Sequence, residues 1–227
     1  MNEIRVIPIT GVPEVRPGDD LAALLADATD ADLRDGDVLV VTQKVVSKAE
    51  GRIVSADDRR EHALAESVAV LRRVGDMIIS ETRQGFVCAN SGVDASNVEE
   101  GTVVLLPEDP DASARRIRAK LAHLAGIDLA VIVSDTFGRA WRIGQTDVAI
   151  GVAGIEPFVD YRGTTDTHGR ELTATSICVA DELAGAAEMV MGKAKGICAA
   201  IVRGANVVRG RGAAVDIVRP PEGDLFR

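Results

Sequence analysis

The chain has 227 residues, enough for one large domain or two small ones with a substantial buried core. A formal net charge of −9 and an aromatic content of only 3% argue against a nucleic-acid partner, which needs a basic or base-stacking surface, and against an anionic membrane. No apolar run reaches the roughly 18 residues of a membrane-spanning helix, and the N-terminus lacks the basic start and apolar stretch of a signal peptide.

The three cysteines, Cys88, Cys178 and Cys198, form no CxxC pair and are odd in number. They stand among apolar or small residues, which favours buried free thiols. A reducing, cytoplasmic location follows from this interpretation.

Hydrophobic spacing and turn residues predict the elements in chain order. We expect strands at 4–9, 38–41, 77–81, 85–89, 102–106, 129–133, 148–152 and 197–202, and helices at 21–31, 55–74, 109–124 and 176–191. The helix at 55–74 rests on the spacing of Leu64, Val68 and Leu71, and residues 159–170 are expected to form a loop or hairpin. Strands and helices mix without a repeated βαβ rhythm, which indicates an α+β or mixed α/β fold.

The first candidate for chemistry is Asp135, which with Thr136 follows the apolar strand predicted at 129–133. The carboxyl ends of strands in open α/β sheets are where ligands bind. A carboxylate beside a hydroxyl is an oxygen-donor pair suited to Mg²⁺ or Mn²⁺, and Arg139 and Gln145 follow closely enough to orient anionic groups. The alternative is that Asp135 only caps a turn and pairs with Arg139.

The second candidate is Asp94, in a loop of small and polar residues after the strand predicted at 85–89. Asn97 in the same loop is able to face a common site. The alternative is an Asx-turn, in which Asp94 bonds its own backbone.

Two further segments carry cations that suit phosphates. Lys44 and Lys48 follow the buried strand at 38–41, but the segment is no Walker A loop, and taken alone it is better explained as a solvated strand end. The glycine-rich residues 203–212 form either a phosphate-binding loop or a flexible hairpin. The three histidines show no metal-ligand spacing.

Six motifs occur in order along the chain: 11–21 (GVPEVRPGDDL), 36–52 (GDVLVVTQKVVSKAEGR), 92–97 (GVDASN), 106–113 (LPEDPDAS), 134–142 (SDTFGRAWR) and 179–183 (VADEL). Together they resemble the coenzyme F420-0:L-glutamate ligase family, also called F420 gamma-glutamyl ligases, over essentially the whole chain.

The resemblance implies an α+β fold with mixed or antiparallel sheets, flanking helices and an intertwined homodimer. The implied enzyme is cytoplasmic and uses GTP to add L-glutamate to coenzyme F420-0, and further glutamates through γ-linkages, with release of GDP and phosphate. It implies two divalent cations per site, Mn²⁺ or Mg²⁺, and allows for K⁺. One ligase domain then occupies 1–227, open to division into two subdomains, and the flavin-binding nitroreductase-like domain fused behind some relatives is not expected.

Site residues carried over from the resemblance fall into two groups. Nucleotide contacts are implied for Val12, Pro13, Glu14, Val15, Gln43, Lys48 and Asn97. Ligation of one metal is implied for Asp94 and Asp135, and ligation of a second for Thr136.

We expect Asp135, Asp94 and Lys48 to carry the catalysis, because metals and a lysine would neutralise the phosphates during γ-phosphoryl transfer. The glycine-rich segment supplies a further metal ligand in the family, and Asn206 is its polar uncharged candidate here. Asp147 or Glu50 is a candidate acceptor of the amine proton.

Two alternative functions stay open at this stage. One is a non-catalytic GTP- or metal-binding module, or the ligase half of a severed bifunctional protein. The other is a ligase acting on a related phosphorylated cofactor.

Overall fold

The computed structural model describes residues 3–29, 32–56 and 58–224. Its centre is a five-stranded mixed sheet in the order β1-β12-β2-β8-β9. Only β2 and β8 run parallel, and all other neighbours are antiparallel. The sheet strands are β1 (Arg5–Ile9), β2 (Val38–Thr42), β8 (Ala130–Arg139), β9 (Arg142–Ala153) and β12 (Ala199–Arg203).

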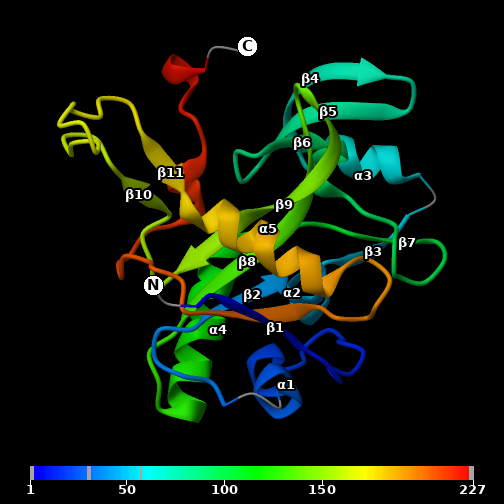
Figure 1. Cartoon of the computed structure of the whole chain (residues 1–227). Coiled ribbons are helices and arrows are strands. Elements are labelled where there is room, and N and C mark those ends of the chain that lie inside the picture. Colours follow the sequence, from blue (N-terminus) through cyan, green and yellow to red (C-terminus); the bar gives the residue numbers. More distant parts are fainter. Residues whose placement is uncertain (1–2, 30–31, 57, 225–227) are drawn as a thin grey trace.

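Helices cover both faces of this sheet, as Figure 1 shows. Helices α1 (Leu21–Ala28) and α4 (Pro110–Ala125) pack on one face, and α5 (Val179–Met191) packs on the other. Because successive side chains of a strand point to opposite faces, β2 divides its run of apolar residues. Leu39 and Val41 join the α1–α4 side, and Val38 and Val40 join the α5 side. The apolar run was therefore correctly interpreted as a strand buried on both faces.

Smaller elements surround the central sheet. They are α2 (Gln43–Ala49), β3 (Ile53–Ser55), α3 (Arg59–Ala65), β4 (Ser67–Val74), β5 (Met77–Thr82), β6 (Val87–Ala89), β7 (Thr102–Val104), β10 (Phe158–Asp160), β11 (Ser176–Cys178) and the 3₁₀ turn Asn90–Gly92. Strands β4, β5 and β6 form a second sheet beside a separate small core that includes Ile78, Val93 and Leu105. The α+β class with mixed sheets and flanking helices is thus confirmed.

The prediction of one helix over 55–74 is wrong in its second half. Helix α3 ends at Ala65, and Ser67–Val74 is strand β4, hydrogen-bonded to β5. Val68 and Leu71 are exposed, so their spacing did not mark a buried helical face. Pairing with a neighbouring strand outweighs the weak helical preference of a segment rich in valine.

Other predicted boundaries need smaller corrections. The helix expected at 21–31 ends at Ala28, and residues 30–31 lie outside the described residues. The helix expected from 176 begins at Val179, because Ser176–Cys178 pairs with β10 as a strand. The strand expected at 129–133 continues to Arg139, which changes the setting of Asp135.

Candidate active site

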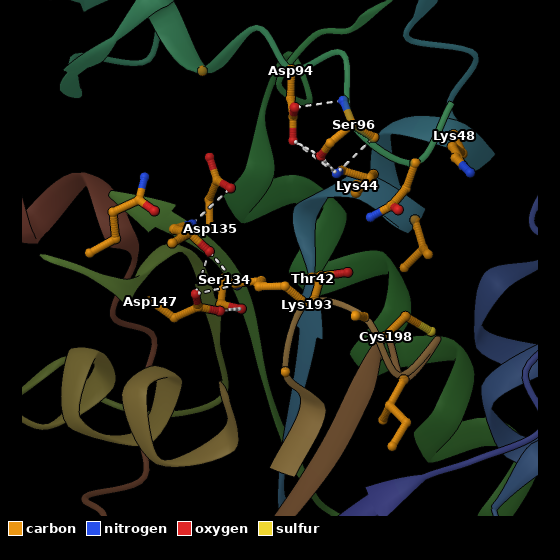
Figure 2. Close-up of a pocket in the computed structure, with 18 of the residues that line it drawn as sticks. Thr42, Lys44, Lys48, Asp94, Ser96, Ser134, Asp135, Asp147, Lys193 and Cys198 are labelled. Atoms are coloured by element: carbon orange, nitrogen blue, oxygen red, sulfur yellow. Dashed lines mark hydrogen bonds and ion pairs between the residues drawn. The ribbon is translucent and has the colours of Figure 1, made fainter. Parts of the chain in front are cut away.

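A cavity of about 780 Å³ opens where β2 ends and α2 begins. Its walls come from the segment before α1, from α2, from the loop after β6, from β8 and β9, and from the segment between α5 and β12. The volume lies within the range of small-molecule and cofactor sites. Figure 2 shows side chains from these distant segments facing one another across it.

Strand β8 brings Asp135 and Thr136 to the cavity because it extends beyond the end of its parallel neighbour β2. Pairing between β2 and β8 stops at Thr42 and Ser134, and from Asp135 onward β8 is paired only with β9. Beyond Ser134, the edge of β8 that β2 no longer covers is open to the cavity. The strand does not end at Asp135 as predicted, but the residue still lies at the carboxyl edge of β2, where the ligand-binding rule for sheets places a site.

Asp147 on β9 is a buried acid next to Thr136. The register sets Thr136 opposite Asp147, so their side chains share one face. Thr136 Oγ1 donates a hydrogen bond of 2.6 Å to Asp147 Oδ1, and Ser134 Oγ donates one of 3.0 Å to Oδ2. Lys193, in the segment after α5, places its Nζ 3.0 Å from Asp147 Oδ1 and also donates to Thr136 Oγ1.

Asp94 is held on another side of the cavity by Lys44. The Lys44 ammonium lies 2.8 Å from Asp94 Oδ2, and the backbone N–H of Ser96 donates to Oδ1 at 2.8 Å. The Asx-turn that competed with a site at Asp94 is therefore present, and it engages one of the two carboxylate oxygens. Burial raises the pKa of Asp94, but the hydrogen bonds from Lys44 and Ser96 outweigh it and leave the pKa below its ordinary value.

Among the described residues no ion pair involves Asp135, although the nearby charge of Lys193 lowers its pKa. Burial, with the negative charges of Asp147 and Asp94, raises the pKa of Asp135 to about 7, against a lowering effect from the Thr136 backbone N–H, which donates to Oδ1 at 2.8 Å. Asp135 thus lies between two other carboxylates. A carboxylate in this position is stabilised by a bound cation.

The donor set fits a hard divalent cation, within a limit. Asp94, Asp135 and Asp147 offer carboxylate oxygens and Thr136 a hydroxyl, which are the ligand types of Mg²⁺ and Mn²⁺. Within 3–29, 32–56 and 58–224, no three His, Cys, Asp or Glu side chains converge on a common metal position. The hydroxyl of Thr136 and oxygens of water or substrate are the further donors that a cation here would use.

The residues assigned to nucleotide contact by resemblance divide between the cavity and the core. Val12, Pro13, Glu14, Val15, Lys48 and Asn97 all line the cavity. Gln43 does not; it is buried and its Oε1 accepts a 2.9 Å hydrogen bond from Ser47 Oγ inside α2. The structure thus brings six of the seven residues together with Asp94, Asp135 and Thr136.

Several alternatives from the sequence are now decided. Arg139 donates to the carbonyl of Ile143 across its own hairpin, so no pair with Asp135 forms. Glu50 is bound to Ser113 and Arg116 outside the cavity lining, while Asp147 is part of that lining. Asn206 lies beyond the far end of β12, in a separate cavity, because β12 begins next to the main cavity and runs away from it.

Lys193 and Arg59 are cavity residues that sequence reasoning missed. The Arg59 guanidinium donates to the carbonyl of Val93, and Lys193 stands between two glycines of the segment GKAKG. A run of small residues after a helix gives no local signal of a site. Only the packing of α5 against the sheet brings Lys193 to Asp147.

The fold and the cavity define the class of the protein: an α+β protein whose acidic residues and lysines meet in one cavity. The family model for F420-0:gamma-glutamyl ligase matches residues 10–204. The chain belongs to this family.

Relatives named coenzyme F420:L-glutamate ligase match nearly full length. The protein of Methanothermobacter thermautotrophicus is 43% identical over 99% of both chains, and that of Methanopyrus kandleri is 44% identical over 99% of this chain and 98% of its own. The protein of Archaeoglobus fulgidus is 40% identical, with 99% and 96% covered. No helix in the described part of the chain has the length and apolar character that crossing a membrane requires.

Proposed function

We propose that this protein is a GTP-dependent ligase that joins L-glutamate to coenzyme F420-0 and can extend the product with further γ-linked glutamates. The observation that carries the proposal is the meeting of Asp94, Asn97, Lys48 and Asp135, from three separate segments, on one cavity. The relatives that match over nearly their whole length are named as ligases of coenzyme F420 and L-glutamate, which supports this choice of substrates.

The cavity provides two kinds of groups for a nucleoside triphosphate. Lys48 lies nearly buried in the wall, where its ammonium pairs with the exposed Glu14 and is able to turn to a phosphate. Residues Val12–Val15 form the adjoining wall, suited to the base or ribose. Divalent cations held by Asp94, Asp135 and Thr136, two per site, neutralise phosphate oxygens when bound.

The proposed reaction proceeds in two balanced steps. A carboxylate oxygen of coenzyme F420-0 attacks the γ-phosphorus of GTP, the bond from that phosphorus to the β-bridging oxygen breaks, and GDP leaves. The resulting acyl phosphate is attacked at carbon by the glutamate amine. The acyl C–O bond breaks, phosphate leaves and the nitrogen loses a proton. The cavity holds the two reactants together, so that the amine meets the acyl phosphate where it forms.

We also propose that the chain works as an intertwined homodimer in the cytoplasm. Apolar side chains stand exposed at the β8–β9 hairpin tip, at Trp141 and Ile143, and on β4, at Val68. Exposed apolar groups of this size are typical of association surfaces. Sedimentation equilibrium should give a dimer for the native chain and a monomer for Ile143→Asp, and a native monomer would contradict the proposal.

Product analysis tests the ligase directly. The protein is incubated with coenzyme F420-0, GTP, Mn²⁺ and L-glutamate, and mass spectrometry should find one or more added glutamyl residues with matching GDP release. Parallel reactions replace GTP by ATP, omit Mn²⁺, or supply K⁺. GTP binding without any glutamylated product would favour a binding module, and product only from another phosphorylated cofactor would favour a ligase of different specificity.

A further inference from the structure

Asp147 is the most deeply buried acid of the cavity, with its side chain only 1% exposed. Both of its oxygens are engaged, Oδ2 by Ser134 and Oδ1 by Thr136 and Lys193. Within the part of the chain that the structure describes, Lys193 is the one basic side chain that forms an ion pair with it. A buried carboxylate requires such a compensating cation.

The lysine that neutralises Asp147 is far more exposed than the one that neutralises Asp94. Lys44 projects from helix α2, is 18% exposed and is fixed by three partners: Asp94, the Ser96 hydroxyl and the Ser96 carbonyl. Lys193 is 55% exposed and lies outside any helix or strand, and its ammonium is also 3.7 Å from Glu188 of α5. Its long side chain lines the cavity and extends toward Asp147 (Figure 2).

The backbone around Lys193 has turning points on both sides. Gly192 and Gly196 adopt φ values of 60° and 68°, in the left-handed region that glycine occupies without strain. The intervening segment joins the end of α5 to β12 and lines the cavity. Rotation at these glycines can move Lys193 without disturbing either element.

The contacts of Lys193 are those of a metal ion. Its ammonium donates hydrogen bonds to Thr136 Oγ1 and to Asp147 Oδ1 at the same time. Those are the oxygens that a hard divalent cation would use at the same point. Thr136 donates its own proton to Asp147, so its lone pairs face the lysine.

We propose that Lys193 occupies the position of a divalent cation between Thr136 and Asp147, and that an incoming Mg²⁺ or Mn²⁺ displaces it into the cavity. Asp147 is then a metal ligand in addition to Thr136. The released ammonium becomes available to an anionic substrate group such as a phosphate or carboxylate. The inference rests on the proposed function only in assigning Thr136 to a metal.

Chemical labelling tests the displacement without any catalytic turnover. Acetylation of each lysine by an activated ester is followed by mass spectrometry, with and without Mn²⁺, in the full chain. Mn²⁺ should raise the labelling rate of Lys193 about tenfold, because displacement frees its nitrogen from Asp147 and Thr136 and leaves it open to the reagent. Lys195, in the same segment, serves as the control and should keep its rate. An unchanged or reduced rate at Lys193 with Mn²⁺ bound would overturn the proposal.

Metal binding provides a second, independent measurement. Electron paramagnetic resonance counts free Mn²⁺ in the absence of nucleotide. Lys193→Gln should bind Mn²⁺ about tenfold more tightly than the native chain, since no ammonium competes for the oxygens. Lys195→Gln should bind as the native chain does, and Asp147→Asn should lose one bound Mn²⁺ while retaining the other. Weaker binding by Lys193→Gln would refute the competition.

The two proposals fail separately. Neither measurement contains GTP, glutamate or coenzyme F420-0, so a protein that forms no glutamyl product can still exchange Lys193 for Mn²⁺. Conversely, if glutamate ligation occurs but Mn²⁺ does not change the labelling of Lys193, the ligase proposal stands and only the displacement of Lys193 is rejected.

Discussion

Each end of the central sheet holds a buried aspartate that faces a basic side chain. Asp37, just before β2, is 2% exposed and receives two hydrogen bonds from Arg203, of 2.8 and 2.7 Å. Asp147, at the opposite end, is 1% exposed and meets Lys193. The acids are alike in burial, and the cations differ in how firmly they are held.

The Arg203 guanidinium is a two-pronged partner fixed within the sheet. It is 17% exposed, belongs to β12 and contacts both oxygens of Asp37, which also accepts from the Arg34 backbone. Hydrogen bonding to Asp37 raises the pKa of Arg203 further above its already high value. The flexible, half-exposed Lys193 makes a single contact with its acid. We infer that one end of the sheet uses a buried charge pair for stability and the other keeps its acid accessible to cations.

Replacing Asp135 should give the largest functional effect. Asp135→Asn removes the carboxylate central to the cavity but keeps its shape, and we expect glutamate ligation to fall about 1000-fold. The rate of GDP release and the product mass measure it. Asp160→Asn, at the exposed residue that ends strand β10, is the matched control and should keep full activity. A normal rate of glutamate ligation in Asp135→Asn would show that Asp135 takes no part in catalysis at this end of the sheet.

Removing the cation at the opposite end should affect stability instead. Arg203→Met leaves Asp37 buried without its charge partner, and we expect a loss of about 3 kcal/mol in the free energy of unfolding. Urea unfolding measures it. Arg5→Met, which breaks only an exposed pair with Glu3, should cost less than about 0.5 kcal/mol. If the folded Arg203→Met protein lost ligase activity to the same extent as Asp135→Asn, the Asp37–Arg203 pair would not serve stability alone, and the proposed difference between the two ends would be wrong.

The thiol of Cys198 should take no part in the chemistry of the cavity, although it lines the wall. Burial raises the pKa of Cys198 from 9.0 to about 11, so the reactive thiolate becomes scarcer at any pH below that value. At pH 8 the thiolate fraction is about 100-fold below that of an ordinary cysteine, and alkylation by iodoacetamide should be slower by the same factor. Rapid alkylation of Cys198 in the native protein, at the rate of the urea-unfolded chain, would contradict this.

Replacing Lys48 should give the smallest of the four predicted effects. Lys48→Met removes a cation near the nucleotide wall, and we expect the KM for GTP to rise about tenfold with a smaller change in kcat. Steady-state kinetics with varied GTP measure it. Lys120→Met, which removes a surface pair with Asp20, is the control. A KM for GTP equal to that of the control would exclude Lys48 from the nucleotide site.

The sequence by itself determined the elements whose signal is local. The run Val38–Val41 specified a buried strand, and Asp109 and Pro110 specified the start of α4, which Asp109 caps through the Ala112 N–H. Six motifs in register identified the family, and they placed Asp94 and Asp135 at a site before any geometry was known. These features depend on short-range patterns of burial, capping and turn formation.

Tertiary structure decided what depends on distant partners. Residues 67–74 became a strand because β5 lies beside them, and β8 ran past Asp135 because β9 continued to pair with it. Asp147 and Lys193, 46 positions apart, met only through the register of the β8–β9 hairpin and the packing of α5. Short-range sequence patterns do not encode contacts between distant residues. The pairing of the buried Asp147 with Lys193 could therefore be recognised only from the fold.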